Sequence, residues 1–191
     1  MLSKLVGLLK QFFVVTVEDK YKKDFIHEIN SINTLRVKIC SITFIVCEIV
    51  VILLTVLIKR KGMFDQPDIY YLYMYFLLTA GMIFFLLSFT RLGKDVQRNL
   101  KKIQIGGVLF ASYILFWCAG ISLLDQLSYG QIVVYLSAII CLGVIPFFPP
   151  IVLFFIFAAS EAFFLILQPF FQESADVVFG NTVNTLTFVI F

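Results

Sequence analysis

The chain has 191 residues, of which 61% are hydrophobic and only 14% are charged. A soluble domain averages about 45–50% apolar and about 25% charged residues, and a chain of this size buries only about 70% of its surface on folding. One soluble core therefore cannot hide this much apolar surface, and the composition predicts a protein solvated by a lipid bilayer. The net charge of +3 is too small and too dispersed to indicate nucleic acid as a partner.

The N-terminal segment, residues 1–38, is too charged to span a membrane. Leucine and phenylalanine recur at roughly helical spacing over residues 2–13, with Lys4 and Lys10 between them. We interpret this pattern as an amphipathic helix at the cytoplasmic membrane interface, while a short helix packed against a core would show the same spacing. Residues 21–36 continue as a polar helix that precedes the first span.

After residue 38 the sequence contains a series of apolar runs. Most of them approach the length of about 20 residues that a helix needs to cross a hydrocarbon core of about 30 Å. The predicted spans are 39–58, 71–90, 105–124, 132–147, 151–167 and 182–191. The sixth run corresponds to about 15 Å of helix and reaches only half way through a bilayer, so we expect the natural product to continue, or the chain to be a truncated copy of a longer protein. The predicted fold is all-α: a polytopic membrane helical bundle with six transmembrane helices, the sixth incomplete.

Lysine and arginine are unevenly distributed between the connections. Twelve of the fifteen lie before the first span or between the second and third, and the other three, Lys59, Arg60 and Lys61, follow the first span. Because cytoplasmic loops carry the excess of Lys and Arg, we expect a cytoplasmic N-terminus and a multi-pass protein of the bacterial plasma membrane. Six spans would return the chain to the cytoplasm at its end, so any further domain would be cytoplasmic.

Two acidic residues lie deep inside the predicted spans. Glu48 is close to the middle of the first span, and Glu161 lies slightly to the extracellular side of the middle of the fifth span. An ionised carboxylate at the bilayer centre costs at least ~2.5 kcal/mol, so each acid must face the bundle or be protonated. Each is either a ligand or proton site or a neutral acid that is hydrogen-bonded between helices.

A dense group of polar residues lies at the predicted outer ends of the last four spans. Its members are Asp125, Gln126, Ser128, Tyr129, Gln131, Tyr135, Gln168, Asn181 and Asn184. With Trp117 one to two turns below and Glu161 beneath, they would rim a pocket open to the outside that binds a small polar or cationic ligand. Alternatively, Asp125 and Gln126 form a tight turn that only caps two helix ends.

Motifs of catalysis and cofactor binding are absent from the sequence. It contains no glycine-rich phosphate loop, no HExxH, no Ser/His/Asp arrangement and no zinc spacing, and its four cysteines lie in apolar runs without a CxxC. We therefore expect no enzymatic activity of this chain, no metal and no cofactor.

Three stretches near the end of the chain resemble one family. Residues 121–135, ISLLDQLSYGQIVVY, are similar to the D-Q-x-x-x-G-Q-I-x-x-Y stretch of the six-span membrane modules that begin many Firmicute diguanylate cyclases. Residues 167–172, LQPFFQ, resemble their L-P-F-F-Q, and residues 180–190, GNTVNTLTFVI, resemble their G-N-x-x-N-x-x-x-F-x-I. The likeness is strongest over residues 105–191. In that family a GGDEF domain follows and makes cyclic di-GMP from two GTP molecules, whereas neither GGDEF nor GGEEF occurs in this chain.

Two functions of different classes remain open from the sequence. The resemblance implies a membrane-embedded sensory input module without its catalytic domain, which detects an unknown small-molecule or membrane-borne signal and transmits it along the sixth span. It also implies a homodimer, because cyclases of that family need two output domains side by side. The alternative is a small transporter or ion-coupled carrier that uses Glu48 and Glu161.

Overall fold

The computed structural model describes residues 17–58, 64–146 and 148–190, and all of its regular structure is helical. The helices of this part of the chain, numbered from α2, are α2 (Asp19–Ile58), α3 (Asp68–Leu92), α4 (Val96–Gln126), α5 (Val133–Val144), α6 (Pro150–Phe171) and α7 (Ala175–Ile190). The predicted all-α fold is therefore confirmed for the described residues. The amphipathic helix predicted over residues 2–13 lies outside them.

Four helices, α2, α3, α4 and α6, are long and apolar enough to cross a membrane. Helices α5 and α7 have 12 and 16 residues, so they extend over about 18 and 24 Å, less than the hydrocarbon thickness of about 30 Å. Helix α5 is thus shorter than the span predicted over 132–147, mainly at its C-terminal end, where Pro146 follows its last residues. Helix α7 begins at Ala175, before the predicted 182, and α6 continues through Pro169 to Phe171, beyond the predicted end at 167.

Helix α2 joins two predicted segments into one helix. The polar helix over 21–36 and the first span over 39–58 form a single element of 40 residues. Neither glycine nor proline occurs between Asp19 and Ile58, so nothing in the sequence breaks the backbone hydrogen bonding where the polarity changes. At about 1.5 Å per residue the helix measures about 60 Å, twice the thickness of a hydrocarbon core.

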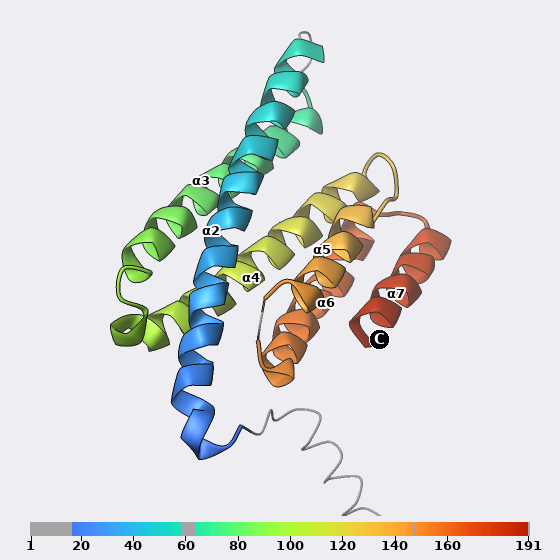
Figure 1. Cartoon of the computed structure of the whole chain (residues 1–191). Coiled ribbons are helices and arrows are strands. Elements are labelled where there is room, and N and C mark those ends of the chain that lie inside the picture. Colours follow the sequence, from blue (N-terminus) through green and yellow to red (C-terminus); the bar gives the residue numbers. More distant parts are fainter. Residues whose placement is uncertain (1–16, 59–63, 147, 191) are drawn as a thin grey trace, which may run out of the picture.

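Helix α4 is the centre of the molecule (Figure 1), where α2, α3, α5 and α6 pack against it. Its fully buried residues include Leu115 and Ala119. Helix α7 packs on α6 and α5 at the side away from α2 and α3. The outward surface is apolar: Leu53 of α2, Phe84 of α3 and Phe155 of α6 are all more than half exposed. A soluble protein seldom presents such continuous apolar surface.

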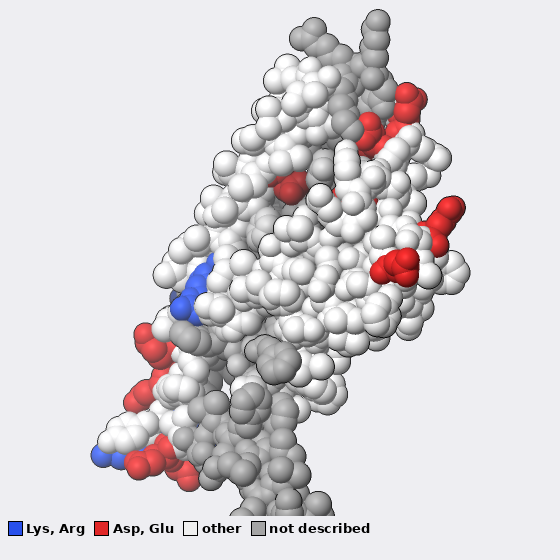
Figure 2. All heavy atoms as spheres, turned by 90° about the vertical axis from the view of Figure 1, so that its right-hand side faces the viewer, with Lys and Arg blue, Asp and Glu red and all other residues white. Residues whose placement is uncertain are grey.

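The described basic side chains gather at one end of the bundle, whereas acidic side chains occur at both ends. The described lysines and arginines lie on the first half of α2 and around the α3–α4 turn, which form one end. The α4–α5 and α6–α7 connections lie at the other end, where Asp125 lies in the last turn of α4, Glu173 lies between α6 and α7, and Asp176 lies in the first turn of α7. On the face shown in Figure 2, the upper half displays acidic side chains and no described basic one.

Candidate functional site

Buried polar side chains from α4, α5, α6 and α7 form one hydrogen-bonded group. We call this group the polar cluster; its members are Ser122, Gln126, Tyr135, Ser160, Glu161, Asn181 and Thr185, all of them buried. Unpaired polar groups in an apolar interior cost about 1–3 kcal/mol each. Such residues are therefore retained only where they satisfy one another or a ligand.

Glu161 of α6 joins three helices through its two carboxyl oxygens. Thr185 Oγ1 of α7 donates a hydrogen bond of 2.5 Å to Oε1, and Tyr135 Oη of α5 donates one of 3.2 Å to Oε2. The Tyr135 hydroxyl also lies 2.8 Å from Ser160 Oγ, and the Tyr135 ring stacks on Phe164 at a centroid distance of 5.0 Å. Both of these donors to the Glu161 carboxyl group are neutral hydroxyls.

Gln126, at the end of α4, organises the second half of the cluster. Its Nε2 donates to the backbone oxygens of Gln131 at 2.8 Å and Ser122 at 3.2 Å, which closes the α4–α5 turn. Its Oε1 accepts a hydrogen bond of 2.9 Å from Asn181 Nδ2 of α7. Ser122 Oγ in turn accepts from the backbone N–H of Tyr135 at 3.1 Å. Because Asn181 and Thr185 are one turn apart on α7, the hydrogen bonds form a ring that includes all four helices.

Gln168 is the unsatisfied member of this neighbourhood. It is fully buried on α6, and neither its Nε2 nor its Oε1 has a hydrogen-bond partner among the described residues. The spacing of seven residues places it on the same face of α6 as Glu161, two turns away. Buried amides in folded proteins are nearly always hydrogen-bonded, and a small polar molecule beside Gln168 would satisfy both of these atoms.

Four predicted site residues are brought together as expected, and the others are not. Gln126, Tyr135, Glu161 and Asn181 belong to the polar cluster. The remaining three lie outside the cluster: Asp125 Oδ1 accepts a hydrogen bond of 2.8 Å from Tyr71 Oη of α3, and Gln131 and Asn184 are exposed. Consecutive helical residues point about 100° apart, so Asp125 faces α3 while its neighbour Gln126 faces α7.

The expected aromatic wall of the pocket also lies elsewhere. The Trp117 indole N–H donates to the backbone oxygen of Met74 of α3 at 2.7 Å. The ring lines an apolar cavity between α2, α4 and α5 that contains no member of the polar cluster.

Sequence reasoning missed Ser122, Ser160 and Thr185. Each is a small hydroxyl residue, a type common in apolar helices, so composition alone did not identify them. A signal was nevertheless present in the spacing. Ser122 precedes Gln126 by four residues and Thr185 follows Asn181 by four, so each pair occupies one helix face.

Glu48 lies apart from the polar cluster. It is buried on α2, and its Oε2 has no hydrogen-bond partner among the described residues. The groups within electrostatic reach include Tyr75 of α3 and Cys118 of α4, whereas Glu161 is bonded to α5 and α7. In the described part of the chain no group of His, Cys, Asp and Glu side chains is arranged to hold a metal ion.

No described protein family, no curated protein and no solved structure matches this chain. The function must therefore be argued from the geometry of the site.

Proposed function

We propose that the chain is a membrane-embedded sensory input module in which the polar cluster reads a signal and α7 transmits it. The observation that carries the proposal is the attachment of α7. Two buried hydrogen bonds, Asn181 to Gln126 and Thr185 to Glu161, connect this helix to α4 and α6. A change at either acceptor therefore alters how α7 is held.

Several features of the molecule support a membrane location for this module. Four helices have the length and apolarity to cross a bilayer, and the outward surface of the bundle is apolar. The described basic residues gather at one end, which the preference of Lys and Arg for the cytoplasm makes the inner one. The polar cluster is then nearer the outer end, where an extracellular or membrane-borne signal would reach it, in the plasma membrane of a bacterium.

Gln168 gives the cluster a capacity to respond. Suppose that α6 and α7 have two arrangements and that a ligand pairs with the Gln168 amide more tightly in one of them. The ligand would then shift the equilibrium toward that arrangement by the difference between its two affinities. The resemblance to the modules of diguanylate cyclases supports a cyclase as the output, and a homodimer as the form that pairs two such outputs.

The test joins residues 1–191 to an intact cyclase domain and measures cyclic di-GMP in cells. Tyr135→Phe alters the polar cluster, and Gln168→Met alters the unpaired amide two turns from Glu161 on α6; both substitutions keep the side-chain volume nearly constant. Gln104→Met and Tyr129→Phe are matched controls, because both parent side chains are exposed. We expect the cluster variants to change cyclase output at equal membrane abundance and the controls to match the parent. Equal output from all five proteins would contradict a sensory role.

An ion-coupled carrier is the second candidate, and the unpaired Oε2 of buried Glu48 favours it. In that case proteoliposomes should show substrate-dependent uptake driven by an imposed proton or sodium gradient. Glu48→Gln should abolish this uptake. The sensory module instead predicts that Glu48→Gln leaves cyclase output unchanged.

A further inference from the structure

A second cavity, separate from the polar cluster, lies between α2, α4 and α5. It has a volume of about 510 Å³, within the range of about 300–1,000 Å³ typical of small-molecule sites. Helix α4 forms its floor through residues such as Phe110 and Ile114, and α2 and α5 form its walls. Thr43, Ser137 and Cys141 line the cavity and are themselves exposed. The cavity is therefore a groove that opens on the side of the bundle.

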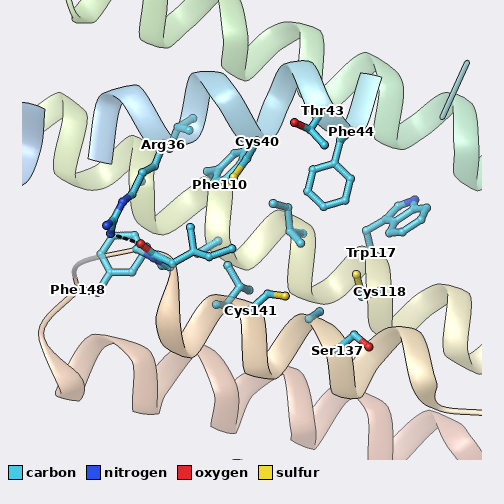
Figure 3. A pocket seen from close by; sticks show the side chains of 18 of the residues that line it. Arg36, Cys40, Thr43, Phe44, Phe110, Trp117, Cys118, Ser137, Cys141 and Phe148 are labelled. Atoms are coloured by element: carbon cyan, nitrogen blue, oxygen red, sulfur yellow. Dashed lines mark hydrogen bonds between the residues drawn. The ribbon is translucent and has the colours of Figure 1, made fainter. Parts of the chain in front are cut away.

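The two ends of this groove differ in chemistry. Figure 3 shows Arg36 at one end, where its guanidinium donates a hydrogen bond to the backbone oxygen of Ile145 just beyond α5, and Trp117 at the other end. Between them the walls are formed largely by aliphatic, aromatic and cysteine side chains. An occupant that fits both parts carries an apolar chain and an anionic head.

The length of the groove along α4 matches the thickness of one leaflet of a bilayer. Along α4 its lining runs from Gly107 to Cys118, which at about 1.5 Å per residue is about 16 Å, half of a hydrocarbon core of about 30 Å. Arg36 lies two residues before Lys38, and Lys38 lines a hollow together with Gly93 of the α3–α4 turn. The charged end of the groove is therefore level with the basic end of the bundle, where phosphate headgroups of the inner leaflet would lie.

We propose that this groove binds one acyl chain of an anionic phospholipid of the inner leaflet, with its phosphate against Arg36. The proposal rests on the membrane location in the proposed function and is independent of the polar cluster. Charge complementarity selects the headgroup, since anionic lipids of the cytoplasmic leaflet attract basic side chains at the helix ends. A guanidinium carries five N–H donors in a fork that suits phosphate oxygens, so it can bond a carbonyl and a phosphate together.

Trp117 makes the groove directly observable, because it is the only tryptophan of the chain. The full chain is reconstituted in phosphatidylcholine vesicles, and co-flotation with the vesicles establishes that it is inserted. Phosphatidylglycerol brominated on one acyl chain is then titrated, with brominated phosphatidylcholine as the comparison. We expect saturable quenching of Trp117, with an apparent preference for phosphatidylglycerol of about fivefold, equivalent to ~1 kcal/mol for one basic side chain near the phosphate.

Substitutions in the groove distinguish binding of the acyl chain from binding of the lipid headgroup. Ala138→Phe fills the groove and should reduce quenching by both lipids, while Ala159→Phe, at an exposed position of α6, should not. Arg36→Gln should remove the preference for phosphatidylglycerol, and Arg98→Gln, an exposed arginine near the same end, should retain it.

Three results would overturn the proposal in an inserted protein. They are equal quenching by both lipids in the parent, an unchanged preference in Arg36→Gln, and quenching only by a brominated free fatty acid. Gln168→Met, which tests the polar cluster, should leave lipid quenching unchanged. A failure of the sensory proposal is therefore distinguishable from a failure of the lipid site.

Discussion

Thr185 is the residue through which α7 contacts the buried acid of α6, and its hydroxyl can be removed with little change of shape. Thr185→Val deletes the donor to Glu161 Oε1 and leaves that oxygen without its partner. Hydrogen bonds between helices of membrane proteins contribute about 0.6–1.7 kcal/mol, so we expect a loss of this size in the free energy of unfolding. Reversible denaturation of the purified protein in mixed micelles measures it.

Thr187→Val is the matched control for this experiment. Thr187 is exposed on the same helix, and its hydroxyl bonds only the backbone oxygen of Val183 one turn earlier. The Thr187→Val variant should therefore have the same free energy of unfolding as the parent protein. Equal losses in the two variants would mean that the Glu161 contact contributes nothing specific.

At the scale of residues, the sequence located the polar cluster but did not resolve its interior. Intramembrane charge is rare and costly, so Glu161 was identifiable from its surroundings alone. Asp125 and Gln126 are adjacent and equally polar, and only the direction of each side chain from α4 assigns one to α3 and the other to α7. That direction depends on how the helices pack, which a single sequence does not encode in its composition.

At the scale of elements, α2 is where the structure departs most from the predicted boundaries. Hydropathy divides residues 19–58 into a polar and an apolar half, and the prediction placed a boundary at residue 38. Helix termination depends on backbone-breaking or capping residues, and the change in polarity supplies neither. The apolar pattern thus located the apolar half of the helix, while its continuity with the preceding polar half was missed.

The continuity of α2 predicts a long distance between its two halves. Spin labels at Asp24→Cys and Leu53→Cys, both exposed positions in α2, are separated by about 43 Å in an unbroken helix. Pulsed electron resonance in a background without the native cysteines measures this distance. The pair Tyr70→Cys and Leu87→Cys on α3 calibrates it at about 26 Å. A distance well below 40 Å for the α2 pair would indicate a bend between the halves.

Gly81 controls the approach of α3 to α4. A Cβ added at this position would lie 2.3 Å from Cζ of Tyr113, whose hydroxyl donates a 2.5 Å hydrogen bond to the backbone oxygen of Leu77. Gly81→Ala must displace this ring, and we expect a destabilisation of about 1–3 kcal/mol. Gly143→Ala on α5 meets no atom within 4 Å and should be neutral or slightly stabilising. Thermal unfolding in detergent compares the two, and equal melting temperatures would contradict the close packing.

At the scale of the whole molecule, the apolar composition together with apolar runs of about 20 residues was enough to predict an all-helical bundle. The number of helices that are long enough to cross a membrane was harder to predict from the sequence. Apolar runs next to prolines, such as 132–147, have the composition of a span, but Pro146 and its neighbours limit the helix to 12 residues. Counting apolar residues overestimates helix length wherever the backbone cannot continue.

The orientation of the molecule in the membrane is the prediction on which both proposals depend. Single cysteines at Phe64 and Tyr129, in the α2–α3 and α4–α5 connections, lie at the end that we assign to the outside, and Lys94 lies in the basic α3–α4 turn. All three positions are exposed. In a background without native cysteines, a membrane-impermeant maleimide should label Phe64→Cys and Tyr129→Cys in intact cells, and Lys94→Cys only after permeabilisation.

The physical reason for this expectation is the arrangement of charge at the two ends. Moving the basic α3–α4 turn to the outer side would oppose the retention of Lys and Arg in the cytoplasm. It would also remove Arg36 from the anionic inner leaflet. Labelling of Lys94→Cys in intact cells, with Tyr129→Cys protected, would reverse the orientation and place the lipid groove in the outer leaflet. Labelling of Phe64→Cys and Tyr129→Cys from opposite sides would instead mean that α3 and α4 do not both cross the membrane.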